Sequence, residues 1–216
     1  VDLVRVRGLS TPDRIAFLLE WDDRTESRGS DPPPDFVSYE DEQWKPFAGT
    51  KRHAWPYSDS ISLQFPLRRM EGSEKPHFFW GSPGNKVDIW EWRASDEGGG
   101  GRAVTEYVGE GYRKPLSPKA TTRSEARSDW SDGVWRVILS RNLATSNPAL
   151  DVQFAQGKII PFALQARDGS SGEVGPLLSL SSWYGVVLKA PVPNNVYAYS
   201  LLSVLLALAA GEQREK

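Results

Sequence analysis

The chain has 216 residues, which is enough for one large β domain with a core of ordinary size, so that a second domain is not required. Its hydrophobic content of 39% and mean hydropathy of -0.48 are typical of a soluble globular protein, and its 28 acidic and 26 basic side chains nearly cancel, which leaves no electrostatic footprint for nucleic acid. The absence of cysteine excludes disulfides, iron-sulfur clusters held by this chain and covalent attachment of c-type haem, so any haem must be held without a covalent bond.

Short apolar or alternating runs recur between turn signals, and the body of the chain has no sustained helical periodicity. This pattern predicts an all-β protein, an antiparallel β-sandwich with long loops. In chain order, the expected strands are residues 3–6, 14–21, 60–65, 76–80, 87–92, 103–108, 134–140, 158–165 and 182–188. The expected loops are residues 28–34, which contain three consecutive prolines, the glycine run 98–101, and residues 114–129, which are rich in Ser, Thr, Lys and Arg.

The C-terminal part of the chain differs from the rest, because residues 196–210 form an almost unbroken apolar run. As a helix this run would reach about 22 Å, which is short of the roughly 30 Å of bilayer hydrocarbon. Two interpretations stay open: a helix that docks on the domain, and a short or truncated membrane anchor. We therefore expect a sandwich domain over residues 1–190 and a tail over residues 191–216. No signal-peptide pattern precedes the first expected strand, so we expect either that a leader has been removed or that the sequence is a fragment.

Few side chains in the sequence indicate chemistry. His53 and His77 are the two histidines, and we interpret each as an ordinary surface residue. No G-x-S-x-G, P-loop or H-E-x-x-H pattern occurs, and no catalytic residue is predicted. The neighbouring Asp22 and Asp23 would point to opposite faces of a strand, so a solvated loop explains them better than a general acid–base pair.

The nine tryptophans and the single methionine, Met70, are the most informative residues. A thioether is a soft ligand that suits haem iron, although a lone methionine is also a common core filler. For the tryptophans three roles compete: core packing, which is the default, walls of a flat cofactor pocket, and an aromatic platform for sugar rings. Trp90 and Trp92 share one face of their expected strand.

Eight segments follow one another in a recognisable order: residues 4–9 (VRVRGL), 15–22 (IAFLLEWD), 62–66 (SLQFP), 75–81 (KPHFFWG), 87–92 (VDIWEW), 135–141 (WRVILSR), 157–169 (ending in Arg167-Asp168-Gly169) and 182–184 (SWY). Their order and spacing resemble the haem-b-binding gamma subunits of type II dimethyl-sulfoxide-reductase-family molybdoenzymes. Ethylbenzene dehydrogenase, dimethylsulfide dehydrogenase, chlorate reductase and selenate reductase carry such subunits. Together the segments cover most of residues 3–188.

The resemblance implies a sandwich that holds one haem b between axial Met and Lys ligands. It implies electron relay to or from an iron-sulfur beta subunit beside a molybdenum catalytic alpha subunit, in a periplasmic or otherwise extracytoplasmic complex. The family's ligating Met is expected directly before Gly81, where this sequence has Trp80, and an indole cannot replace a thioether on iron. We therefore expect Met70 and Lys158 as the cofactor-binding, iron-ligating residues, with Lys189 as the weaker lysine. A lysine ligand must be neutral, which requires burial.

The sequence thus predicts a non-catalytic electron-transfer subunit with a non-covalently bound haem b. One alternative is a haemless relative that serves assembly or anchors the complex to a membrane through residues 196–210. A second alternative is a carbohydrate-binding module on a similar sandwich, which would need two or three tryptophans exposed in a line.

Overall fold

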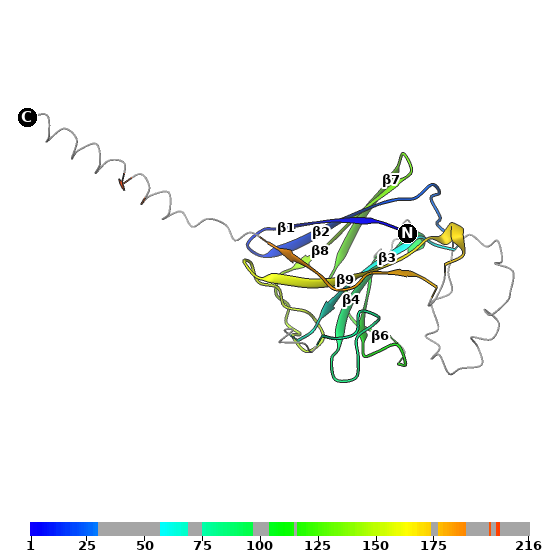
Figure 1. Ribbon diagram of the computed structural model, residues 1–216. Coiled ribbons are helices and arrows are strands. Elements are labelled where there is room, and N and C mark those ends of the chain that lie inside the picture. The colour runs from blue at the N-terminus through cyan, green and yellow to red at the C-terminus, as the bar shows by residue number, and fades with distance from the viewer. Residues whose placement is uncertain are drawn as a thin grey trace, which may run out of the picture.

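The computed structural model describes residues 1–29, 57–68, 75–96, 104–114, 116–173, 177–188, 199 and 202–203. Over these residues the chain forms two antiparallel sheets packed face to face, which confirms the predicted all-β sandwich (Figure 1). The first sheet has the strand order β1-β2-β8-β7. The second has the order β10-β9-β3-β4-β5-β6, with β11 paired to β9 beside this path.

The first sheet buries one face. It consists of β1 (Val4–Ser10), β2 (Arg14–Asp22), β8 (Val134–Asn142) and β7 (Glu125–Ser131). Burial alternates along β2 and β8, as expected when the inner face of an antiparallel sheet packs on a core and the outer face meets water. The apolar residues at every second position therefore explain why these two strands were predicted.

The second sheet is covered on both faces at its centre. It consists of β10 (Ser179–Leu180), β9 (Ile159–Arg167), β3 (Ser60–Pro66), β4 (Val87–Arg93), β5 (Val104–Gly109), β6 (Ser117–Pro118) and β11 (Tyr184–Val187). Every residue of β3 and β4 is buried, including the polar ones. Two short 3-10 helices, η2 (Ala94–Asp96) and η3 (Gly169–Ser171), follow β4 and β9.

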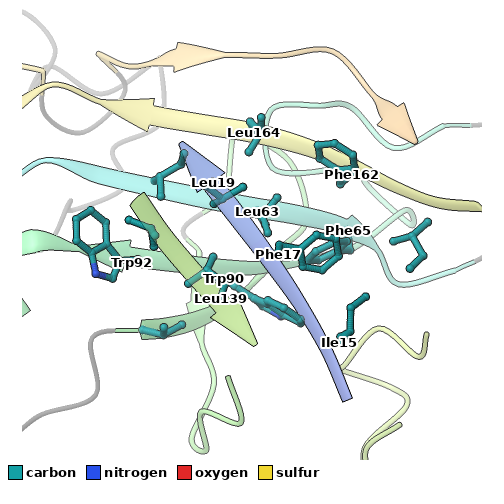
Figure 2. Packing of buried hydrophobic residues seen from close by; sticks show 14 of the residues in the cluster. Ile15, Phe17, Leu19, Leu63, Phe65, Trp90, Trp92, Leu139, Phe162 and Leu164 are labelled. Carbon is teal, nitrogen blue, oxygen red and sulfur yellow. The ribbon is translucent and has the colours of Figure 1, made fainter. Parts of the chain in front are cut away.

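The core between the sheets is aromatic (Figure 2). Phe17 of β2 lies 5.5 Å from Phe65 of β3 between ring centroids, and Trp92 of β4 lies 4.8 Å from Trp135 of β8. Each fully buried large apolar side chain stabilises the fold by about 1.5–3 kcal/mol. Such contacts connect strands that are far apart in the sequence, so they fix the position of one sheet on the other.

Core packing is confirmed as the main role of the tryptophans that the structure describes. Trp21, Trp80, Trp90, Trp92 and Trp135 are buried, and the other two described tryptophans are half-buried. The described residues therefore present no line of exposed tryptophans of the kind that the carbohydrate-binding alternative requires.

Two of the predicted elements are wrong. Residues 76–80, expected as a strand, form an irregular segment that ends in a turn, because Trp80 and Gly81 both have positive φ angles. Residues 114–129, expected as a loop, contain β6 and most of β7. β7 lies at the edge of its sheet and has half-buried Ala126 and Ser128 at its inner positions, so its sequence lacks the apolar alternation that reveals β2.

Most of the predicted tail falls outside the described residues. Tyr199, Leu202 and Ser203 are described, and they are helical and exposed. In the described part of the chain, no helix combines the length and the apolar character needed to cross a bilayer. The division at residue 190 stays a prediction.

Candidate functional site

The segment that contains Trp80 lies on the outer face of the second sheet, the face opposite the core. The backbone N–H of Trp80 donates to Gln64 Oε1 at 3.0 Å, and its indole Nε1 donates to Gln165 Oε1 at 2.7 Å. Gln165 Nε2 in turn donates to Gln64 Oε1 at 3.2 Å. Because Gln64 and Gln165 belong to the paired strands β3 and β9, the two amides form a polar platform that positions Trp80.

The turn at Trp80 depends on glycine at its neighbours. Trp80 has a φ of 63° and Gly81 a φ of 82°, and a left-handed conformation costs a non-glycine residue about 1–2 kcal/mol. Gly109 of β5 lets the turn approach closely, since a Cβ at that position would lie 2.6 Å from the Trp80 carbonyl oxygen. That carbonyl accepts a hydrogen bond from the N–H of Gly111 at 2.7 Å, so the sheet edge stabilises the turn.

Around Trp80 the outer face carries a second apolar cluster, which we call the Trp80 cluster. Trp80 is only 3% exposed, and Phe79 stacks on it with 3.9 Å between ring centroids. The cluster consists of the buried Trp80, Val87 and Ile89 and the partly buried Phe79, Tyr107, Tyr112, Leu116, Leu178 and Trp183. None of these nine described residues has a thioether, an imidazole or an amine.

The Trp80 cluster does not fit an axial-ligand site for haem iron. The indole of Trp80 offers one N–H donor and no lone pair, and this donor already bonds Gln165. His77, the nearest imidazole in the sequence, is exposed, and its Nδ1 accepts from the N–H of Phe79 at 3.0 Å. The Trp80 cluster therefore offers iron no thioether, imidazole or amine ligand among its described residues.

The predicted ligands lie elsewhere in the chain. Met70, Lys189 and His53 fall outside the described residues. Lys158 is exposed and directly precedes β9, whereas Gln165, which contacts Trp80, lies seven residues further along that strand, about 23 Å away at 3.3 Å per residue. The structure therefore places Lys158 away from the Trp80 indole, and the pairing of Met70 with Lys158 stays a prediction.

A buried ion network, which sequence reasoning missed, lies inside the sandwich. Lys119 is 4% exposed at its side chain, and its Nζ contacts Asp88, Glu106 and Asp151 at 2.7, 3.2 and 2.8 Å. Arg141 of β8 adds a contact to Asp88 at 3.2 Å and so joins the first sheet to the second. Arg123 also contacts Asp151, at 3.1 Å, so that three cationic side chains face three carboxylates. The charges of the network therefore balance, and we assign it a structural role.

The pKa shifts in this network follow from its geometry. Burial is the largest influence on Asp88 and raises the pKa of its carboxyl, against the opposing effect of Lys119 and Arg141. Burial alone would lower the pKa of Lys119, but Asp88, Asp151 and Glu106 together outweigh it and raise that pKa. Lys119 is therefore held in its charged form, in which it cannot act as a base or a metal ligand.

Three carboxylates gather at one end of the sandwich: Asp23, Asp59 and Asp168. The prediction that Asp22 and Asp23 are solvated is right for the exposed Asp22 and wrong for Asp23, which is 7% exposed. Alternation explains the difference, because the side chain that follows the outward Asp22 turns inward. Burial raises the pKa of the Asp59 carboxyl to about 6, although hydrogen bonds from Ser27 and Gly169 act in the opposite direction.

These observations define a two-sheet antiparallel β-sandwich with a sealed aromatic cluster on its outer face. Comparison with known protein families identifies it further. The family described as "Ethylbenzene dehydrogenase" matches residues 1–119, which is more than half of the chain. The chain therefore belongs to the ethylbenzene dehydrogenase family, and the resemblance noted in the sequence is confirmed.

Two individual proteins are similar to this chain. A Haloferax mediterranei protein, provisionally named a respiratory nitrate reductase heme subunit, is 25% identical over 209 residues, which are 97% of this chain and 64% of that protein. A crystal structure of a provisionally named carbohydrate-binding protein from Bacteroides uniformis aligns with a TM-score of 0.40 and 11% identity, over 88% of this chain and 72% of the other. At that TM-score the structural likeness supports no conclusion.

Proposed function

We propose that this chain is the electron-transfer subunit of a respiratory oxidoreductase complex in which another polypeptide performs the catalysis. The observation that carries the proposal is the similarity over 97% of the chain to a protein named as a heme subunit of a respiratory nitrate reductase. Membership of the ethylbenzene dehydrogenase family supports it. The chain spans 64% of that relative, so the activity and composition of the whole complex are part of the proposal.

In its finer form the proposal assigns a non-covalently held haem b to this chain, with Met70 and Lys158 as axial ligands. When bound, haem supplies a one-electron iron couple. The lack of cysteine in the full sequence supports non-covalent binding. The role of the chain's own residues is to hold two ligand atoms in place and to keep water away from the group.

The backbone next to Lys158 is well anchored for such a role. The Gly157 N–H donates to the Leu188 carbonyl at 3.0 Å, and Gln156 Nε2 donates to the Thr11 carbonyl at 2.7 Å. These bonds tie the start of β9 to β11 and to the β1–β2 turn. The Lys158 side chain itself is exposed, so its use as a neutral ligand requires cover from a partner subunit or from a segment outside the described residues.

The ligand assignment is tested by optical spectra of the complex purified through a tag on this chain. We expect a haem spectrum in the wild type that is lost or shifted in Met70→Ala and in Lys158→Ala. Lys114→Ala is the matched control, because Lys114 is also exposed and pairs with Glu110 at 2.9 Å on the surface. Wild-type spectra in both ligand variants would refute the assignment, and a colourless wild-type complex would refute the haem relay.

We propose an iron-sulfur beta subunit and a molybdenum alpha subunit as partners, in an extracytoplasmic complex, as the family resemblance implies. Co-purification through the tagged chain, followed by metal analysis, tests the partners. Fractionation of the producing cells tests the location. Recovery of the chain alone from the cytoplasm would contradict both parts.

A second candidate function is favoured by the Trp80 cluster. Its buried indole occupies the place at which the family resemblance calls for a ligating methionine, which is what a haemless subunit with a role in assembly would show. If this chain has that role, the complex should contain no haem, and its remaining subunits should separate when this chain is deleted. If residues 196–210 anchor the complex, their removal releases it from membranes, and a truncated complex that stays membrane-bound contradicts anchoring.

A further inference from the structure

The carboxylates of Asp23, Asp59 and Asp168 come from three strand ends and from both sheets. Asp23 follows β2 of the first sheet, Asp59 precedes β3 and Asp168 follows β9 of the second. Ser60 and Arg167 are partners in the β3–β9 ladder, which places Asp59 beside Asp168. One oxygen from each of the three carboxylates lies within 4.8 Å of the others.

Hydrogen bonds hold Asp59 and Asp168 in position without using all their lone pairs. Asp59 Oδ1 accepts from the Gly169 N–H at 2.8 Å, and Oδ2 accepts from the Ser27 N–H at 2.7 Å and from the Trp135 indole at 3.0 Å. Asp168 accepts from Ser170 and Ser171 within the turn of η3. Because two carboxylate oxygens offer about four lone-pair sites, each group retains an acceptor position.

Asp23 is buried with one carboxylate oxygen unsatisfied. The residue is 7% exposed, and its Oδ1 accepts from the Thr25 N–H at 3.1 Å. Its Oδ2 is buried and has no hydrogen-bond partner. The nearby Trp21 side chain lowers the pKa of the Asp23 carboxyl, and its indole N–H is likewise buried without a full hydrogen bond. A buried, unsatisfied carboxylate oxygen is costly and is rarely left without a purpose.

No compensating cation is present among the described residues, since no described lysine or arginine forms an ion pair with any of the three carboxylates. Three carboxylates at this spacing repel one another when they are ionised. Burial, and then the neighbouring Asp168, raise the pKa of Asp23. The arrangement resembles a ligand set for a cation more than a network complete in itself, unlike the charge-balanced contacts around Lys119.

We propose that Asp23, Asp59 and Asp168 bind one calcium ion that links the two sheets. Calcium takes oxygen ligands at 2.3–2.6 Å, so two oxygens on opposite sides of the ion lie about 4.6–5.2 Å apart, and three oxygens within 4.8 Å of one another can share it. Asp23 supplies the ligand from the first sheet. Water or backbone carbonyl groups complete the six to eight positions that calcium requires.

The site fixes the packing of the sandwich rather than carrying electrons, so it does not depend on the proposed function. Gly169 already packs tightly on the Tyr57 carbonyl, and Asp59 bonds the backbone of both Ser27 and Gly169. An ion at this point therefore joins the segment after β2 to the turn after β9. The expected consequence is a calcium-dependent increase in thermal stability.

Binding is tested on the full chain after treatment with a chelator. Terbium, which replaces calcium at oxygen sites, should show luminescence on excitation of tryptophan, because Trp135 donates directly to Asp59. Calcium should displace it at a stoichiometry of one ion per chain. At calcium about 100-fold above its dissociation constant, the unfolding temperature should rise by about 5–10 °C. Absence of both effects, or luminescence that calcium does not reduce, would overturn the proposal.

Asp23→Asn provides the variant test, and Asp22→Asn is the matched control, because Asp22 is adjacent but exposed. We expect Asp23→Asn to lose the calcium-dependent temperature shift, and its metal-free form to be no less stable than the metal-free wild type, since repulsion is relieved. Asp22→Asn should keep the full shift. Retention of the shift in Asp23→Asn would overturn the proposal. Should Asp23→Asn not fold, the terbium titration of the wild type decides.

Discussion

Replacement of Trp80 by phenylalanine should destabilise the chain by about 2–5 kcal/mol. The change removes the indole N–H that donates to Gln165 Oε1 at 2.7 Å, and leaving a buried acceptor without its donor costs about 1–3 kcal/mol. The smaller ring leaves a void in the Trp80 cluster that costs a further 1–2 kcal/mol, roughly. Equilibrium unfolding in urea measures the sum as a shift in the transition midpoint at constant slope.

Trp183→Phe is the matched control. Trp183 belongs to the same cluster, and its indole donates to the Pro76 carbonyl at 2.7 Å, but the residue is only half-buried. The lost hydrogen bond should therefore cost about 0.5–1.5 kcal/mol. The smallest loss of stability expected from the missing hydrogen bond is larger than about 0.5 kcal/mol. A Trp80→Phe variant whose free energy of unfolding lies closer than that to the wild-type value would refute the idea that this indole seals the outer face of the second sheet.

Two further predictions concern buried groups. Lys119→Met should lower the free energy of unfolding by about 3–5 kcal/mol, because it leaves three buried carboxylates with less compensating charge. Lys114→Met, on the surface, should lower it by at most about 1 kcal/mol. Equal losses of stability in urea unfolding would contradict the network's structural role. Gly169→Ala should destabilise by several kcal/mol, since its Cβ would overlap the Tyr57 carbonyl oxygen. Gly84→Ala is the control, because a Cβ at Gly84 would meet no atom within 4 Å, so that only the strain of its φ of 78° should lower the stability, by about 1 kcal/mol. If thermal unfolding shows Gly84→Ala to be the less stable of the two variants, the close contact between Gly169 and Tyr57 is wrong.

The parts of the fold that could be predicted from the sequence are those with a local signal. β2, β3 and β8 carry apolar residues at every second position, and β4 is a short run of mixed residues with tryptophans at two alternate positions. β7 has no such signal, because an edge strand with one half-buried face tolerates polar residues. Residues 76–80 are apolar enough for a strand, but the positive φ of Trp80 depends on Gly109 from a distant strand.

The candidate sites were harder to predict because they depend on contacts between distant residues. Lys119 meets Asp88 and Asp151 from 31 and 32 residues away, and nothing in the local sequence marks Lys119 as buried. Asp23 and Asp168 acquire their role from the meeting of β2 with β9, which no spacing rule anticipates. The family could be predicted, in contrast, because the order of eight short segments carries the information.

A chemical haem assay on the complex isolated through this chain, with molybdenum and iron determined on the same sample, tests the proposed electron-transfer role. Electron transfer predicts about one extractable haem b per copy of the chain, alongside molybdenum in a companion polypeptide. A molybdenum-containing complex with no extractable haem would contradict it, and would instead favour an assembly role for a sandwich whose outer face is closed by Trp80.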